Sequence, residues 1–557
     1  MKTIYKVVMC TGLLLASISC SDSFLDEEVK DKYSPSTLND KLGFDAAVVG
    51  IHQHFATLPK SSNDQTFINI WNIGTDILWA PAGRSNGDAR PYFDYAQMNA
   101  SDAASLKLWR YLYKLINNAN NLIASAQQAD IPGLSEADKA VYEGEAKFFR
   151  AYAYDMLVTL YGGVPLVIEP TVEPRTDFTR ASVAEINSLI EADLLFAVEK
   201  LPKIGAAAKE GRANKAMARQ LLGTAYLRMG EDAKAEAQLT EIINGNSGAL
   251  SLVKNRFGVR ANLPGDAFSD LFIFGNQRRS QGNTEVIWVL ENENPTDKQY
   301  STDSPQQRRN WGGGYYDVAG MLPSDSLGGR SIGRVRLNNW VLYSLYQDED
   351  MRNSKYNLRR HWYFNNTDAK YSAIRGQEVP YGIDKEFTLG DGSKIKVLAA
   401  DTVWRLAPYI TKWSAFDPRD TFGYGMWKDF ILMRLAETYL LRAEARFNQG
   451  NTSGAADDLN EVRGRANASV VDADDITLDY ILDERARELI GEENRRMTLV
   501  RTGTLVTRAT TLSGTTPLAN GNIETTNGLT DKHLLLPIPQ LEIDLNKDAK
   551  LDQNPLY

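Results

Sequence analysis

The feature that most constrains this chain is a run of small and bulky residues that suits two packed helices. Leu222-Gly223 is followed by Tyr226, and then by Ala235 and Leu239. The small side chains at Gly223 and Ala235 let two antiparallel helices approach closely, while Tyr226 and Leu239 fill the seam. The spacing therefore predicts a tightly packed helix pair in this part of the chain.

Part of this spacing recurs near the C-terminus. The glycine, alanine and leucine that begin at Gly230 have counterparts at Gly450, Ala455 and Leu459. The first run matches all five positions of the tetratricopeptide pattern. Two such matches within one chain predict helix pairs that stack as in a solenoid.

Other segments also place apolar residues at helical spacing. Helices are predicted over 104–127, 139–161 and 181–200, from Asp429 to a stop at Gly450, around 459–463, and over 477–500. Ser182 and Glu185 form a capping box at one helix start. The chain is therefore expected to be mostly α-helical.

The middle of the chain, from about 255 to 420, has a different character. Gly, Pro, Asn and aromatic residues dominate, and short strands are predicted only at 285–290 and 386–389. The segment 295–335 is interpreted as long loops. Long loops in a compact protein are uncommon and often functional.

The N-terminus is typical of an exported lipoprotein. Lys2 and Lys6 precede a short apolar run that ends in small residues and Cys20. The run is too short to span a bilayer, so a cleaved signal at 1–19 is predicted. The segment resembles a bacterial lipobox, with Cys20 acylated and followed by an acidic tether at 20–34. The alternatives are an ordinary signal with a chance cysteine and a merely solvated linker.

Composition and motif searches exclude several functions. The chain has 557 residues, a formal net charge of −9, two Cys and four His. Mild acidity argues against a nucleic-acid partner. No H-E-x-x-H, C-x-x-C or G-x-S-x-G motif occurs, so no metal site, catalytic residue or cofactor is predicted. A glycosidase stays open as an alternative, because its two carboxylates need not be close in sequence.

A set of motifs between residue 100 and the C-terminus resembles one known family. They are Trp109-x-x-x-Tyr113-x-x-Ile116-Asn117-x-Ala119-Asn120, Glu145-Ala146-Lys147-Phe148-x-Arg150, Tyr161-Gly162-Gly163-Val164-Pro165-Leu166, Arg434-Leu435-Ala436-Glu437-x-Tyr439-Leu440, Leu459-Asn460-x-Val462-Arg463-x-Arg465, Pro537-Ile538-Pro539 and Gln553-Asn554-Pro555. Together they resemble the SusD/RagB family of outer-membrane lipoproteins. Asn494-Arg495-Arg496-Met497 departs from the family, which usually has an aromatic beside the second arginine.

The resemblance implies a SusD-like fold, with tetratricopeptide-like helix pairs supporting a loop-rich ligand-binding region. One domain is expected over 35–557. Its helical scaffold is assigned to about 35–250 and 427–505, its loop-rich region to about 255–426, and a closing segment to 506–557. The implied protein is lipid-anchored at the cell surface in the outer membrane. It binds an oligosaccharide, has no catalytic activity, and delivers the ligand to a SusC-type TonB-dependent transporter. A peptide ligand, as in RagB-like members, is the alternative.

Two aromatic stretches, 71–95 and 299–316, are candidates for the sugar site. Sugar rings stack their C–H faces on aromatic planes and need polar partners for their hydroxyls, and such sites are mostly preformed. The expected ligand-binding residues are Trp79, Trp311, Arg84, Asn310, Asp76, Tyr315, Tyr316 and Tyr92. Trp79 and Trp311 are the stacking platforms, with Arg84 and Asn310 as polar partners. The alternative is that each aromatic packs its own loop.

The charged residues of the helix motifs have a structural interpretation. Arginines and glutamates recur along the last three predicted helices, and they are expected to form ion pairs between helices rather than an acid–base site. The residues are Arg434, Glu437, Glu444, Arg463, Arg465, Arg485 and Glu488.

Overall fold

The computed structural model describes most of the chain from residue 38 onward. The described residues are 38–60, 65–80, 87–128, 131–207, 209–292, 305–324, 327–347, 349–414, 425–513, 515–518, 521–524 and 526–557. The expected signal, Cys20 and the tether lie outside them. Among the described helices, none combines the length and the apolar character needed to cross a membrane.

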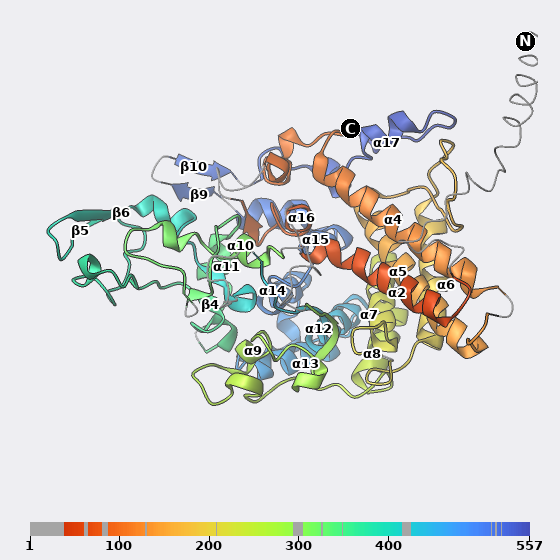
Figure 1. Ribbon diagram of the computed structural model, residues 1–557, viewed down its shortest axis with the longest axis horizontal. Coiled ribbons are helices and arrows are strands. Elements are labelled where there is room, and N and C mark those ends of the chain that lie inside the picture. Colours follow the sequence, from red (N-terminus) through yellow and green to blue (C-terminus); the bar gives the residue numbers. More distant parts are fainter. Residues whose placement is uncertain are drawn as a thin grey trace, which may run out of the picture.

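Long helices build the first part of the scaffold. They are α2 (Lys41–Lys60), α3 (Thr66–Trp71), α4 (Ala103–Ala126), α5 (Glu136–Tyr161) and α6 (Val183–Lys200). Ser182 and Glu185 form the predicted capping box at the start of α6. Helix α4 packs on α5, and α5 packs on α6 (Figure 1). The three predicted helices at 104–127, 139–161 and 181–200 are confirmed.

The two tetratricopeptide-like matches form neighbouring helix pairs. The pairs are α7 (Lys215–Met229) with α8 (Asp232–Ile243), and α12 (Leu435–Asn448) with α13 (Thr452–Arg465). A Cβ placed on Gly223 would lie 2.9 Å from Leu239 of α8, so the predicted close approach is confirmed. Helix α12 also packs on α8, which joins the two pairs although about 200 residues separate them.

Two helix predictions near the C-terminus are wrong. Phe430–Arg434 is strand β8, which pairs with β2 (Val286–Leu290), and helix α12 begins only at Leu435. Periodicity alone cannot distinguish a buried apolar strand from a helix. The predicted helix 477–500 is also interrupted. Helix α14 (Leu478–Leu489) ends before Gly491, whose φ of 87° lies in the left-handed region.

Short elements complete the chain. The remaining helices are α9 (Ala267–Asp270), α10 (Gln307–Trp311), α11 (Asn339–Tyr343), α15 (Arg495–Arg501), α16 (Leu505–Arg508) and α17 (Gln540–Leu545). The remaining strands are β1 (Leu78–Trp79), β3 (Arg336–Leu337), β4 (Leu358–Arg359), β5 (Lys385–Thr388), β6 (Lys394–Val397), β7 (Tyr409–Ile410), β9 (Thr515–Leu518) and β10 (Gly521–Glu524). The described strands form five antiparallel two-stranded pairs. The two predicted strands are confirmed as β2 and β5.

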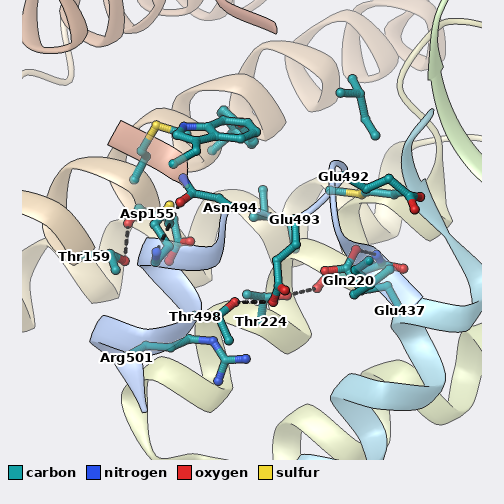
Figure 2. Close-up of a pocket in the computed structure, with 18 of the residues that line it drawn as sticks. Asp155, Thr159, Gln220, Thr224, Glu437, Glu492, Glu493, Asn494, Thr498 and Arg501 are labelled. Carbon is teal, nitrogen blue, oxygen red and sulfur yellow. Dashed lines mark hydrogen bonds between the residues drawn. The ribbon is translucent and has the colours of Figure 1, made fainter. Parts of the chain in front are cut away.

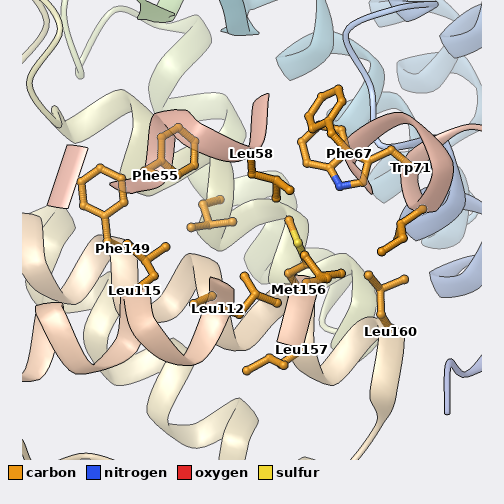
Figure 3. Close-up of a cluster of buried hydrophobic side chains, with 14 of the residues drawn as sticks. Phe55, Leu58, Phe67, Trp71, Leu112, Leu115, Phe149, Met156, Leu157 and Leu160 are labelled. Carbon is orange, nitrogen blue, oxygen red and sulfur yellow. The ribbon is translucent and has the colours of Figure 1, made fainter. Parts of the chain in front are cut away.

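The main core lies between α2, α3, α4 and α5. Phe55 and Leu58 of α2 lie above Leu112 of α4 and Phe149 and Met156 of α5 (Figure 3). Burying each such side chain contributes about 1.5–3 kcal/mol relative to leaving it exposed. This cluster extends from Leu38 to Leu551, so both ends of the described chain contribute to it.

A second, smaller core lies beneath the loops. Tyr315, Trp362 and Tyr409 stack in sequence, with Tyr315 and Trp362 ring centroids 4.7 Å apart. In Figure 1 this loop-rich region extends to the side of the molecule away from α6 and α8. The smaller core therefore supports the loop-rich region beside the helical scaffold.

Candidate functional site

The two tryptophans expected to stack on sugar are buried. Trp79 is 0% exposed and Trp311 is 3% exposed, and Trp311 belongs to the main hydrophobic core. A ring enclosed on both sides cannot offer a face to a ligand. The structure therefore contradicts the assignment of Trp79 and Trp311 as stacking platforms and supports the alternative that they pack their own loops.

Asp76 and Tyr92 are structural residues. The Asp76 carboxylate is buried and lies 2.6 Å from Arg495 and 2.9 Å from Arg508. Burial alone would raise the pKa of Asp76, but the charges of Arg495 and Arg508 hold it below its usual value. The Tyr92 hydroxyl donates to Asp102 over 2.7 Å, and its ring is buried. Neither side chain is available to a ligand.

The remaining predicted residues differ in their surroundings. Tyr315 is buried and its hydroxyl donates to the Gly329 carbonyl over 2.6 Å. Asn310 is buried, and its Oδ1 accepts from Arg334 over 2.9 Å. Tyr316 is half-exposed. Arg84 lies outside the described residues. Among the predicted ligand-binding residues that the structure describes, Tyr316 is the one with a partly solvent-exposed side chain.

The structure nevertheless brings the two predicted stretches together. The segment 332–337 runs between them. Its first part bonds to α10, with the Val335 amide donating to the Asn310 carbonyl over 3.2 Å. Its second part is β3, where Arg336 lies opposite Trp79 of β1. The two stretches therefore belong to one region, but their tryptophans are buried within it.

Residues 404–405 pass close to the backbone of this region at two glycines, Gly313 and Gly333. A Cβ at Gly333 would lie 2.6 Å from the Trp404 carbonyl oxygen, and one at Gly313 would clash with the Arg405 carbonyl. Only residues without a side chain allow this close approach. Gly313 and Gly333 thus allow the backbone of Trp404 and Arg405 to lie close to the segment after α10 and to 332–337.

Half-exposed rings and arginines form the outer surface here, which we call the loop face. It comprises Tyr316, Arg330, Arg334, Trp404 and Arg405. The Arg405 guanidinium lies 4.1 Å from the centre of the Trp404 ring, and Arg330 lies 5.7 Å from that of Tyr316. Aromatic planes beside guanidinium donors are the groups that a sugar ring and its hydroxyls need.

Sequence reasoning missed four of these five residues. Arg330, Arg334, Trp404 and Arg405 lie outside the stretches 71–95 and 299–316. Trp404-Arg405 repeats the aromatic-plus-polar pattern of Asn310-Trp311, and that pattern was the available signal. The burial of Trp311 and the partial exposure of Trp404 arise from tertiary packing, which no local pattern reveals.

The charged residues of the scaffold helices surround a separate cavity of about 140 Å³ (Figure 2). Arg434 pairs with Glu285, Glu488 and Glu492, and Arg485 pairs with Glu437 and Glu493. The prediction of ion pairs between packed helices is confirmed. Because these carboxylates are held by guanidinium groups, they contribute to the scaffold rather than forming an acid–base pair. Across the described residues, no group of three or more His, Cys, Asp or Glu side chains is placed to hold a metal ion.

A second cavity, of about 290 Å³, lies between α4, the 165–178 segment and α17. Its walls are mainly apolar. The polar Asn546 in it bonds to both backbone groups of Phe178. Trp109, Tyr113 and Phe178 line it beside Arg110, and the Arg175 guanidinium lies 4.8 Å from the centre of the Phe178 ring. It lies outside the two predicted aromatic stretches.

The helical scaffold with stacked pairs and a loop-borne surface defines the class of SusD-like proteins. The sequence profile described as the SusD family matches residues 284–557. A second profile, described as starch-binding and associating with the outer membrane, matches residues 23–227. The chain belongs to the SusD/RagB family, as its motifs predicted.

Known relatives cover nearly the whole chain. The SusD-like protein P25 of Formosa agariphila is 25% identical over 566 residues, covering 98% of this chain and 97% of that protein. The starch-binding protein SusD of Bacteroides thetaiotaomicron is 25% identical over 465 residues, covering 76% of this chain and 74% of that protein.

Solved structures confirm the predicted fold. A laminarin-binding SusD-like protein has a TM-score of 0.68 at 21% identity, covering 93% of this chain and all of that one (100%). Surface glycan-binding protein A from Bacteroides thetaiotaomicron, in complex with laminarihexaose, has a TM-score of 0.68 at 19% identity, covering 92% of this chain and 99% of that one. At these identities the likeness concerns the fold.

Proposed function

We propose that this protein binds an oligosaccharide at the cell surface and delivers it to a SusC-type TonB-dependent transporter. The observation that carries the proposal is the loop face, where Trp404 and Tyr316 are half-exposed and each lies beside an arginine. The starch- and laminarin-binding relatives support a glycan as the ligand. The family membership supports a place at the outer membrane.

The loop face suits sugar binding for physical reasons. A sugar ring presents an apolar C–H face that covers an aromatic plane, and its hydroxyls accept from fixed guanidinium donors. The close approach at Gly313 and Gly333 positions the Trp404 backbone before any ligand arrives. A preformed site loses less affinity to the ordering of loops.

We propose binding without catalysis. A glycosidase needs two facing carboxyl groups about 5–10 Å apart. At the loop face, Asp401 is buried and paired with Arg405. The Asp401 carboxylate therefore faces a guanidinium group.

The lipid anchor is a separate part of the proposal. Cys20 is the expected site of acylation, and multiple acyl chains hold a protein firmly in a bilayer. Replacing Cys20 with Ala should release the protein from the membrane fraction. Retention of the Cys20→Ala variant in that fraction, with a normal yield, would exclude lipidation as the anchor.

Calorimetric titration tests the ligand. The mature chain without residues 1–20 is titrated with plant, host and microbial oligosaccharides, and in parallel with a peptide mixture. We expect saturable heat with one glycan class. The affinity for that glycan should fall at least about tenfold in Trp404→Ala, because loss of one aromatic stacking platform typically weakens binding by about that factor. Phe274→Ala is the matched control, since Phe274 is 63% exposed on another loop. Heat from peptides alone would select the peptide-binding alternative.

Deleting the transporter tests the delivery step. We expect uptake to be abolished in the deletion strain while this protein still binds its ligand. Normal uptake without the transporter would refute the delivery role and leave the binding role intact.

A further inference from the structure

Seven arginines come together around the loop face, and we call them the arginine cluster. They are Arg308, Arg309, Arg330, Arg334, Arg336, Arg359 and Arg405. The described parts of the same segments (305–324, 327–337, 358–359 and 399–410) carry two acidic residues, Asp317 and Asp401. The chain as a whole has a formal net charge of −9. The described parts of these segments therefore carry a net positive charge, whereas the chain as a whole is negative.

Contacts confirm that these arginines share one region. Arg334 donates to Asn310 over 2.9 Å. The Ile332 amide donates to the Arg309 carbonyl over 3.3 Å, and Trp362 stacks on Tyr315 with ring centroids 4.7 Å apart. Arg359 also lies 5.7 Å from the centre of the Trp362 ring.

Several buried hydrogen-bond donors in this region lack an acceptor among the described residues. They are the Nε1 atoms of Trp79 and Trp311, the Nδ2 of Asn310, and the Nε atoms of Arg336 and Arg405. Two buried amide oxygens, of Gln307 and Asn338, flank them without a donor. A buried donor without an acceptor is costly. Because these atoms are buried, ordered water would complement them, whereas a ligand meets the half-exposed guanidinium groups of the loop face.

We infer that the ligand is an acidic oligosaccharide, one whose sugars carry carboxylate or sulfate groups. The inference rests on the proposed oligosaccharide-binding function. The guanidinium fork matches carboxylate and sulfate oxygens in a bidentate manner. A neutral glycan would gain only stacking and ordinary hydrogen bonds from the same surface, so the arginine cluster favours the charged ligand.

Matched ligands test the role of charge without altering the protein. The mature chain is titrated with oligogalacturonates and with the same oligomers after methyl esterification, which neutralises each carboxylate and adds a methyl group to it. Sulfated carrageenan oligosaccharides and their desulfated forms make the second pair. We expect the charged member of one pair to bind at least about tenfold more tightly, and its affinity to fall as salt rises.

The possible results separate the inference from the proposed function. Equal affinity for the charged and neutral members, or binding of neutral glycans alone, overturns the inference and leaves glycan binding intact. Heat from peptides and from no glycan overturns the proposed function itself. The pair that responds identifies whether carboxylate or sulfate is recognised.

Variants of the arginine cluster provide the second test. Arg405→Gln and Arg334→Gln should each weaken binding of the charged oligosaccharide by about tenfold, and binding of its neutral partner much less. Arg175→Gln is the matched control, because Arg175 is an exposed arginine paired with Asp177 away from the loop face. Thermal melting checks that each variant is folded. An equal loss for charged and neutral ligands would overturn the inference.

Discussion

Glu488 is the counter-charge for three buried arginines. Its two carboxylate oxygens accept from Arg434 and Arg465 on one side and from Arg352 on the other. Replacing Glu488 with Gln keeps the shape but leaves buried positive charge uncompensated, so we expect a loss of about 3–5 kcal/mol in the free energy of unfolding. Urea denaturation measures it. Glu386→Gln, at a 56% exposed side chain paired with Lys394, should change stability by less than about 1 kcal/mol.

Trp79 and Trp404 should respond to alanine substitution in opposite ways. Trp79 is fully buried, so Trp79→Ala is expected to lower the free energy of unfolding by about 3–5 kcal/mol through the cavity it leaves. Trp404 is half-exposed, so Trp404→Ala should cost less than about 1 kcal/mol and instead weaken oligosaccharide binding. Denaturation and titration of both variants give the comparison. A stable Trp79→Ala variant with impaired binding would restore Trp79 to the ligand site.

At the scale of the elements, Gly223 sets how closely α7 approaches α8. A Cβ at Gly223 would lie 2.9 Å from Leu239, so Gly223→Ala should destabilise the protein by about 1–3 kcal/mol through overpacking. Gly464 in α13 is the matched control, because a Cβ there meets nothing within 4 Å. Gly464→Ala should stabilise the protein by about 0.5–1 kcal/mol. The difference in urea midpoint between the two variants measures the packing effect.

Helices can be predicted from the sequence where one apolar face of the helix packs against a neighbouring helix. Helices α4 to α8 are predictable because their apolar residues repeat with the helical period and their ends carry caps such as Ser182. Strand β8 was not predictable, since a buried apolar run fits either state until its pairing with β2 is known. The candidate site was predictable only as a region. Burial of the predicted tryptophans involves contacts between segments far apart in the sequence, such as the pairing of Trp79 in β1 with Arg336 in β3.

For the whole molecule, the buried ion pairs predict a loss of stability in acid. Burial alone would raise the pKa of Glu484 and Glu493, but the charges of Arg352 and Arg485 respectively lower both from 4.5 to about 2. The folded state therefore prefers the charged carboxylates. Their stabilising contribution is complete above pH 4.5 and is lost as the pH falls toward about 2, because the unfolded chain takes up protons first.

Urea denaturation between pH 7 and pH 3 measures this dependence. We expect the unfolding midpoint to fall steeply below about pH 4.5. Glu484→Gln should be less stable at pH 7 and should show a shallower fall, since the substituted side chain no longer titrates. The exposed Glu386→Gln variant should follow the wild-type curve. A midpoint that stays constant down to pH 3 would mean that these carboxylates are not held in the charged form by their arginines, and that the scaffold depends on its apolar core alone.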